Sequence, residues 1–229
     1  MSTATIAETA MNAIHWYRKG LRIHDNPGLY EACKFGGKVF PLFIFDAKVH
    51  NAERIGPNRF AFLLQSLEDL DTTLRSMGSR LYVLKGDPEF EIKNLITEWN
   101  IRLLTFEHDP DPYFRHLDSR ILNIAQSCMV KVSVHSSHMI HDISKYTSGR
   151  AESIPTSYSA FCKAFGSITN FREEAPLPSF STHSNYKDEE NISDRFDLRS
   201  AMTPFGYSED SWPVLYRGAC PRLKLHIEK

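Results

Sequence analysis

Short apolar runs alternate with longer amphipathic segments from residue 13 to residue 135, and this alternation constrains the fold more than any other feature of the chain. Five runs have the length and the β-branched or aromatic content of buried strands: 14–17, 39–45, 80–84, 102–106 and 129–135. The segments between them place apolar residues at helical spacing, most regularly over 57–78. The pattern predicts an α/β fold, with a five-stranded parallel, doubly wound (Rossmann-like) sheet and helices on both faces.

The stretch 13–27 predicts a binding edge on that sheet. Its strand-like start is followed by a loop that carries four basic or titratable side chains: Arg18, Lys19, Arg22 and His24. Asn26 and Pro27 then provide a helix cap and a proline at the first helical position. Ligands of open parallel sheets lie outside the carboxyl ends of the strands, where the strand order reverses. If the first strand flanks that point, residues 18–26 form the lip of a site.

Two interpretations of this basic loop stay open. The guanidinium groups of Arg18 and Arg22 could hold an anionic ligand, because they match carboxylate and phosphate oxygens bidentately. Alternatively, the acidic loop 107–111 faces the basic loop if the first and fourth strands are neighbours. In that case the charges form ion pairs that only order the two loops.

The aromatic side chains near the ends of the first two predicted strands also allow two interpretations. They are Trp16, Tyr17, Phe43 and Phe45. Packing in the core is the ordinary role of such residues. The alternative is a pocket for a flat chromophore, in which the rings provide stacking surface and the basic lip binds anionic groups. The two roles are compatible.

Other sites find little support in the sequence. The chain contains neither G-x-G-x-x-G nor the G-x-x-x-x-G-K-[ST] phosphate loop, and we find no nucleophile elbow, so we assign no catalytic residue. His135, His138 and His141 lack the neighbouring ligands of a zinc site, so we assign no metal. The net charge of −1 gives no long-range attraction for nucleic acid or an anionic membrane. No window approaches the roughly 20 apolar residues that span a bilayer.

The motifs themselves resemble a known family. HWYRKGLRIHDNP at 15–27 is very similar to the opening signature of the amino-terminal α/β domain of cryptochromes and photolyases, as found in animal cryptochromes and (6-4) photolyases. NRF at 58–60, leading into FLLQSLEDLD at 62–71, is a second strong match. LTFE at 104–107 and SHMIHD at 137–142 are weaker matches.

Periodicity, local composition and the resemblance together predict a division of the chain into three parts. Residues 1–12 are expected to be a disordered leader, 13–142 the α/β antenna domain, and 143–229 an irregular connector that is partly helical near 154–165. In this family the flavin (FAD), the DNA-lesion pocket and the electron-transfer tryptophans belong to a carboxy-terminal helical domain. The chain is therefore expected to end before that domain, to carry no FAD, to have no lyase activity and not to bind DNA.

The function implied is that of a cryptochrome-like protein of the blue-light photoreceptor or circadian-clock regulator class, in the cytoplasm and nucleus. A fragment of a (6-4) photolyase that repairs ultraviolet lesions is the alternative. Full-length relatives also carry an antenna pigment of folate or deazaflavin type in some cases, and five residues are candidates for such a pocket: Arg18, Phe43, Phe45, Glu107 and Asp109. Lys19, Arg22 and His24 are the candidates for binding clock or signalling proteins at the mouth of the sheet.

Overall fold

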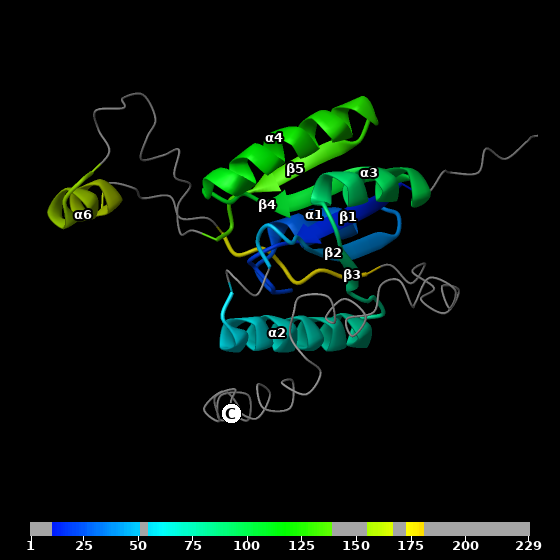
Figure 1. Cartoon of the computed structure of the whole chain (residues 1–229), viewed down its shortest axis with the longest axis horizontal. Helices are drawn as coiled ribbons and strands as arrows, with labels where there is room; N and C mark the ends of the chain where they lie inside the picture. The colour runs from blue at the N-terminus through cyan, green and yellow to red at the C-terminus, as the bar shows by residue number, and fades with distance from the viewer. Residues whose placement is uncertain (1–10, 51–54, 139–154, 167–172, 181–229) are drawn as a thin grey trace, which may run out of the picture.

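The computed structural model describes residues 11–50, 55–138, 155–166 and 173–180. Five strands form one parallel sheet: β1 (Asn12–Tyr17), β2 (Val39–Phe45), β3 (Tyr82–Lys85), β4 (Ile101–Glu107) and β5 (Lys131–His135). The helices are α1 (Pro27–Lys34), α2 (Pro57–Ser76), α3 (Pro88–Glu98), α4 (Pro112–Ser127) and α6 (Tyr158–Gly166). The strand order β3-β2-β1-β4-β5 confirms the predicted fold class (Figure 1).

Helices cover both faces of the sheet because side chains alternate along each strand. On one face, Ile14 and Trp16 of β1 pack with buried residues of α3 and α4. On the other face, Ala13 and Tyr17 pack with buried residues of α1 and α2. Figure 1 shows α2 on the opposite side of the sheet from α3 and α4. The central strand β1 is therefore enclosed on both sides, as its apolar sequence predicts.

Three helices, α1, α3 and α4, begin where the sequence provides a side-chain cap followed by proline. Asn26 caps α1 by accepting a hydrogen bond from the Leu29 backbone amide at 3.0 Å. Asp87 and Asp111 cap α3 and α4 in the same way. Proline at the start of a helix costs no hydrogen bond, because the first backbone N–H groups have no partner within the helix.

Two predicted strands begin later in the structure than in the sequence analysis. Met129, predicted as the start of a strand, has φ +56 and ends the α4 turn, so β5 begins at Lys131. The strand predicted from residue 80 begins at Tyr82, since the Leu81 backbone N–H donates to Asp71 Oδ1 of α2 at 2.8 Å. The backbone N–H of Leu81 is therefore bonded to the Asp71 side chain of α2 and not to a neighbouring strand.

Two segments beyond the sheet are also described. α6 overlaps the helix predicted near 154–165, and none of its residues is buried. Residues 173–180 lie against the α/β unit, where Phe180 packs on the core between the sheet, α1 and α2. Residues 1–10 of the predicted leader and most of the predicted connector lie outside the described residues, so the division at residue 142 stays a prediction, whereas Asn12, predicted as the last residue of the leader, begins β1. Within the described segments, no helix is both long enough and apolar enough to cross a membrane.

Candidate site at the mouth of the sheet

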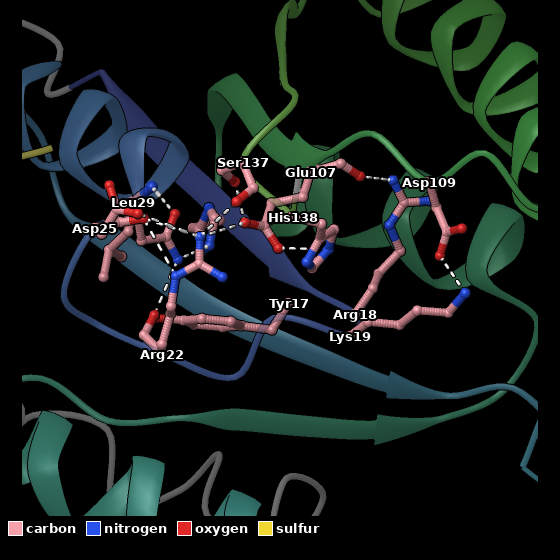
Figure 2. A network of polar contacts seen from close by, with 12 residues as sticks. Tyr17, Arg18, Lys19, Arg22, Asp25, Leu29, Glu107, Asp109, Ser137 and His138 are labelled. Atoms are coloured by element: carbon pink, nitrogen blue, oxygen red, sulfur yellow. Dashed lines mark hydrogen bonds and ion pairs between the residues drawn. The ribbon is translucent and has the colours of Figure 1, made fainter. Parts of the chain in front are cut away.

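The strand order reverses between β1 and β4, so the predicted lip does lie at the switch point. Trp16 pairs with Phe106 near the carboxyl ends of these strands, which brings the two following loops together. We call the region formed by the loops 18–26, 108–111 and 136–138, together with Glu107 at the end of β4, the mouth. Figure 2 shows its polar side chains.

Arg18 belongs to the scaffold of the mouth. Its Nη1 donates to Asp118 Oδ1 of α4 at 2.7 Å, and its Nη2 donates to the backbone carbonyl of Glu107. The guanidinium also lies about 5 Å from the centres of three rings: Trp16, Phe106 and Phe114. Burial raises the pKa of Asp118, although the charge of Arg18 acts in the opposite direction. With its side chain only 4% exposed, Arg18 is committed to internal partners.

Glu107 is the centre of the polar network. Ser137 Oγ donates to Oε1, His138 Nε2 lies 2.7 Å from Oε2, and Arg22 Nη2 lies 3.5 Å from Oε1. Burial acts to raise the pKa of Glu107, but the hydrogen bonds from His138 and Ser137 and the nearby positive charges bring it below its usual value. The buried carboxylate therefore joins the loop after β1 to the loop after β5 (Figure 2).

Gly20 allows the loop after β1 to close over this carboxylate. A β-carbon at Gly20 would overlap Glu107 Oε2 and would lie 2.7 Å from His138 Cε1. The Glu107 carboxylate is buried and held by several hydrogen bonds, so moving it away would cost free energy. A residue without a side chain is needed here.

Lys19 and Asp109 form the second connection between the loops. Lys19 Nζ lies 2.6 Å from Asp109 Oδ2, and the Lys19 side chain is 51% exposed while that of Asp109 is 5% exposed. Burial acts to raise the pKa of Asp109, but the hydrogen bonds from Lys19 and from the Asp111 backbone amide bring it below its usual value. The half-exposed Lys19 thus pairs with a carboxylate that is nearly buried.

Arg22 and His24 differ in how far they reach solvent. Arg22 Nε and Nη2 donate to the Asp25 carbonyl at 3.2 and 3.0 Å, and Nη2 also donates to the Ser137 carbonyl at 3.0 Å. Asp25 itself has φ +48, a left-handed conformation that aspartate tolerates better than most residues. His24 is exposed. The loop is therefore fixed by Arg22, while His24 forms part of its outer surface.

A buried histidine supports the loop from below. Asn26 Oδ1 accepts from the Leu29 amide, so its Nδ2 donates to His15 Nε2 at 3.0 Å. The proton of the imidazole is then on Nδ1, which donates to Thr105 Oγ1 at 2.9 Å. Burial lowers the pKa of His15 to about 3, which keeps the ring neutral. The network ties β1, β4 and the start of α1 together.

The structure places the predicted site residues in two groups. One group comes together at the mouth: Arg18, Lys19, Arg22, Glu107 and Asp109. These residues contact one another through ion pairs and hydrogen bonds, as the ion-pair interpretation of the basic loop predicts. Phe43 and Phe45 are 1% and 0% exposed and pack in the core on the α1/α2 side, together with Phe60. Neither ring offers a face for stacking, so these residues as placed do not fit a flat pigment.

Several residues of the site were missed in the sequence analysis. They are Asn26 in its role toward His15, Thr105, Asp118, Ser137 and His138. Asp118 could have been found, because it shares the buried face of α4 with Leu117 and Ile121. A carboxylate at such a position indicates a buried cationic partner. Asn26 was predicted only as a helix cap, and Ser137 and His138 fall in the weaker SHMIHD match, which does not indicate their contacts; Thr105 carries no pattern of its own.

Two of the three histidines near the end of β5, His135 and His138, have separate surroundings. His135 Nε2 lies 2.9 Å from Glu31 Oε2 of α1, while His138 contacts Glu107. His141 lies outside the described residues. Among the residues that the structure describes, no group of three or more His, Cys, Asp or Glu side chains is arranged to hold a metal ion.

Comparison with known proteins decides the family. Residues 13–180 match the family model described as DNA photolyase. The chain belongs to this family. The match confirms the resemblance carried by the opening signature, and it covers all five strands of the sheet.

Several curated proteins similar to this chain are cryptochromes. Cryptochrome-1 of Sylvia borin is 34% identical over 96% of this chain, and cryptochrome-2 of Gallus gallus is 32% identical over 95% of it. The chain spans only 36% and 38% of the length of these two proteins. This chain is therefore similar to one part of a cryptochrome.

Solved structures of the family share the fold. A bacterial class III photolyase from Agrobacterium tumefaciens has a TM-score of 0.67 at 24% identity, covering 80% of this chain and 40% of that one. The cryptochrome of Synechocystis sp. PCC6803 has a TM-score of 0.66 at 19% identity, covering 74% and 36%. An archaeal photolyase from Sulfolobus tokodaii, solved with two FAD molecules, has a TM-score of 0.59 at 23% identity, covering 75% and 38%. At these identities the likeness concerns the fold alone.

Proposed function

We propose that this chain is the α/β domain of a cryptochrome-type protein, of the blue-light photoreceptor or clock-regulator class, and that its mouth binds a partner protein. The names of the similar curated relatives support the class. The expected partners are clock or signalling proteins, and the expected location is the cytoplasm and nucleus.

The observation that carries this proposal is the closed ion-pair network of the mouth. Glu107 and Arg18 are buried and paired with groups of the same chain. Lys19 and His24 form an exposed rim around them. A surface that is already ordered suits protein binding, because interfaces of this kind change little in backbone on association. Charged groups at the rim mainly increase the rate and selectivity of encounter.

A pigment finds weaker support at the same place. An aromatic ligand of folate or deazaflavin type requires stacking surface and free polar groups, and it buries about 70–90% of its surface. Phe43 and Phe45 are enclosed in the core, and Arg18 donates to Asp118 and to the Glu107 carbonyl. We therefore assign no role in pigment chemistry to these side chains.

The test is a binding titration of the purified chain with clock proteins that bind cryptochromes. His24→Glu places a negative charge on the rim without removing any described buried contact, and we expect it to weaken binding severalfold. His116→Glu is the matched control, since His116 is exposed on α4 outside the mouth. Equal effects of the two changes, or no binding of any such protein, would contradict the proposal. A parallel titration with a reduced folate and a deazaflavin is expected to show no stoichiometric pigment.

The alternative function is that of a (6-4) photolyase fragment. It is supported by the description of the matching family model. The assay is exposure of DNA containing a (6-4) lesion to the purified chain under light. We expect neither repair nor bound flavin, because the mouth as placed does not fit a flavin. Light-dependent loss of the lesion would favour the alternative.

A further inference from the structure

We infer that residues 173–180 act as a strap that holds the mouth in its closed, ion-paired arrangement. The strap is distant in sequence from every loop of the mouth. Its contact with Asp25 nevertheless connects it to Arg22. Because the inference concerns regulation of the mouth, it rests on the function proposed above.

The strap is attached at two points. The Ala175 backbone N–H donates to Asp25 Oδ1 at 3.0 Å, and Phe180 packs on the core between the sheet, α1 and α2. Between these points Pro178 is buried, whereas Leu177 is 69% exposed. Two prolines in the segment favour an extended backbone and reduce the conformational entropy lost on docking. The strap is the yellow segment in Figure 1.

Asp25 connects the strap to the mouth. Its side chain accepts the hydrogen bond from the strap, while its carbonyl accepts two hydrogen bonds from Arg22. The left-handed backbone at Asp25, with φ +48, is thus held from both sides. Such a conformation costs energy for a residue other than glycine and persists when its surroundings fix it.

Arg22 connects Asp25 to the rest of the mouth. The same Nη2 that donates to Asp25 also donates to the Ser137 carbonyl and lies 3.5 Å from Glu107 Oε1. When the strap leaves, the Asp25 carboxylate loses the hydrogen bond from Ala175 and keeps the weaker contact of its Oδ2 with Arg22 Nη2 at 3.9 Å, so the Arg22 acceptors are held less firmly in place. The loops 18–26 and 136–138 then open more often.

This arrangement couples two binding events. A partner that recognises the closed mouth binds more tightly when the strap is docked, and by thermodynamic reciprocity the bound partner stabilises the docked strap. A segment or protein that competes for the strap's contacts with Asp25 and the core weakens binding at the mouth. The strap is therefore a point at which binding at the mouth can be regulated.

Hydrogen exchange of the purified chain tests the inference directly. Phe180→Ala removes the apolar anchor, and Ala175→Pro removes the backbone N–H that donates to Asp25 Oδ1. Leu177→Ala is the matched control within the same strap, since this side chain is largely exposed. The readout is amide exchange at Leu21 and Arg22, whose N–H groups bond to the carbonyls of Lys19 and Gly20, and at residues 136–138.

We expect severalfold faster exchange at these amides in Phe180→Ala and Ala175→Pro, and no change in Leu177→Ala. Unchanged exchange at the mouth, while the strap itself exchanges faster, would overturn the inference, and so would an equal effect of all three changes. The measurement needs no partner. Its failure would leave the partner-binding proposal standing, and absence of a partner would leave the strap proposal standing.

Discussion

Replacing Glu107 by glutamine tests whether the buried carboxylate holds the mouth together. The side chain keeps its shape, but one carboxylate oxygen becomes an NH₂ group that can only donate. Because Ser137, His138 and Arg22 all approach with donor groups, one of the contacts becomes unfavourable. Hydrogen bonds to charged groups are each worth about 1.5–3 kcal/mol, and breaking a buried ion pair costs about 3–5 kcal/mol.

We expect Glu107→Gln to lower the free energy of unfolding by about 2–4 kcal/mol, since some replacement contacts will form. The pH dependence provides a second criterion. The pKa of Glu107 is lowered in the folded state from its usual value of 4.5, so its contribution is present above that pH and is lost as the pH falls below it. The difference between wild type and variant should therefore shrink in acid.

The assay is urea denaturation followed by tryptophan fluorescence, at neutral pH and in steps below pH 4.5. Glu68→Gln on the exposed face of α2 is the control, and we expect it to change stability by less than about 0.5 kcal/mol. A similarly small effect of Glu107→Gln at neutral pH would refute the reasoning. A difference that stays constant in acid would show that it does not arise from the ionised carboxylate.

Three further predictions follow from the same contacts. The pKa values of about 3 for His15 and about 4 for His50 lie below the unfolded value of 6.5, so only the unfolded state gains these protons as the pH falls. The free energy of unfolding, measured with denaturant, should therefore drop by about 2.5 kcal/mol between about pH 7 and pH 5.5. A flat profile would contradict the burial of both rings. Gly20→Ala should cost about 1–3 kcal/mol in the same assay, because the methyl group overlaps the Glu107 carboxylate, and a neutral effect would show that the loop moves freely. Arg22→Ala should lower the free energy of unfolding by about 2 kcal/mol, because it leaves the Asp25 and Ser137 carbonyls without this donor. A loss below about 0.5 kcal/mol would show that Arg22 does not hold the loops together and behaves as an exposed surface residue.

The sheet could be predicted from the sequence because its signals are local. Each strand is a short apolar run, each helix repeats at 3.6 residues, and caps such as Asn26-Pro27 mark the starts. The errors lie at strand ends. Leu81 gives its N–H to Asp71 of α2, a contact between distant parts of the chain that no local pattern contains.

The mouth could be predicted only in part. The acidic loop was predicted to face the basic loop if the first and fourth strands were neighbours; β1 does pair with β4, and the ion pair of Lys19 with Asp109 shows that the loops face each other. The partner of Arg18 was not foreseen, since Asp118 lies 100 residues away on α4. Residue type alone also could not decide between packing and stacking for Phe43. That choice depends on α1 and α2, which cover its face of the sheet.

The central claim is that the mouth is an ordered surface that binds a protein partner. The most direct measurement is a ¹H–¹⁵N chemical-shift map of the labelled chain during titration with a clock protein that binds cryptochromes. We predict the largest shifts at residues 18–26 and 108–111 around the switch point, with His24→Glu weakening the same titration. Shifts confined to α6 or to the outer face of α2, or binding that His24→Glu leaves unchanged, would contradict the account.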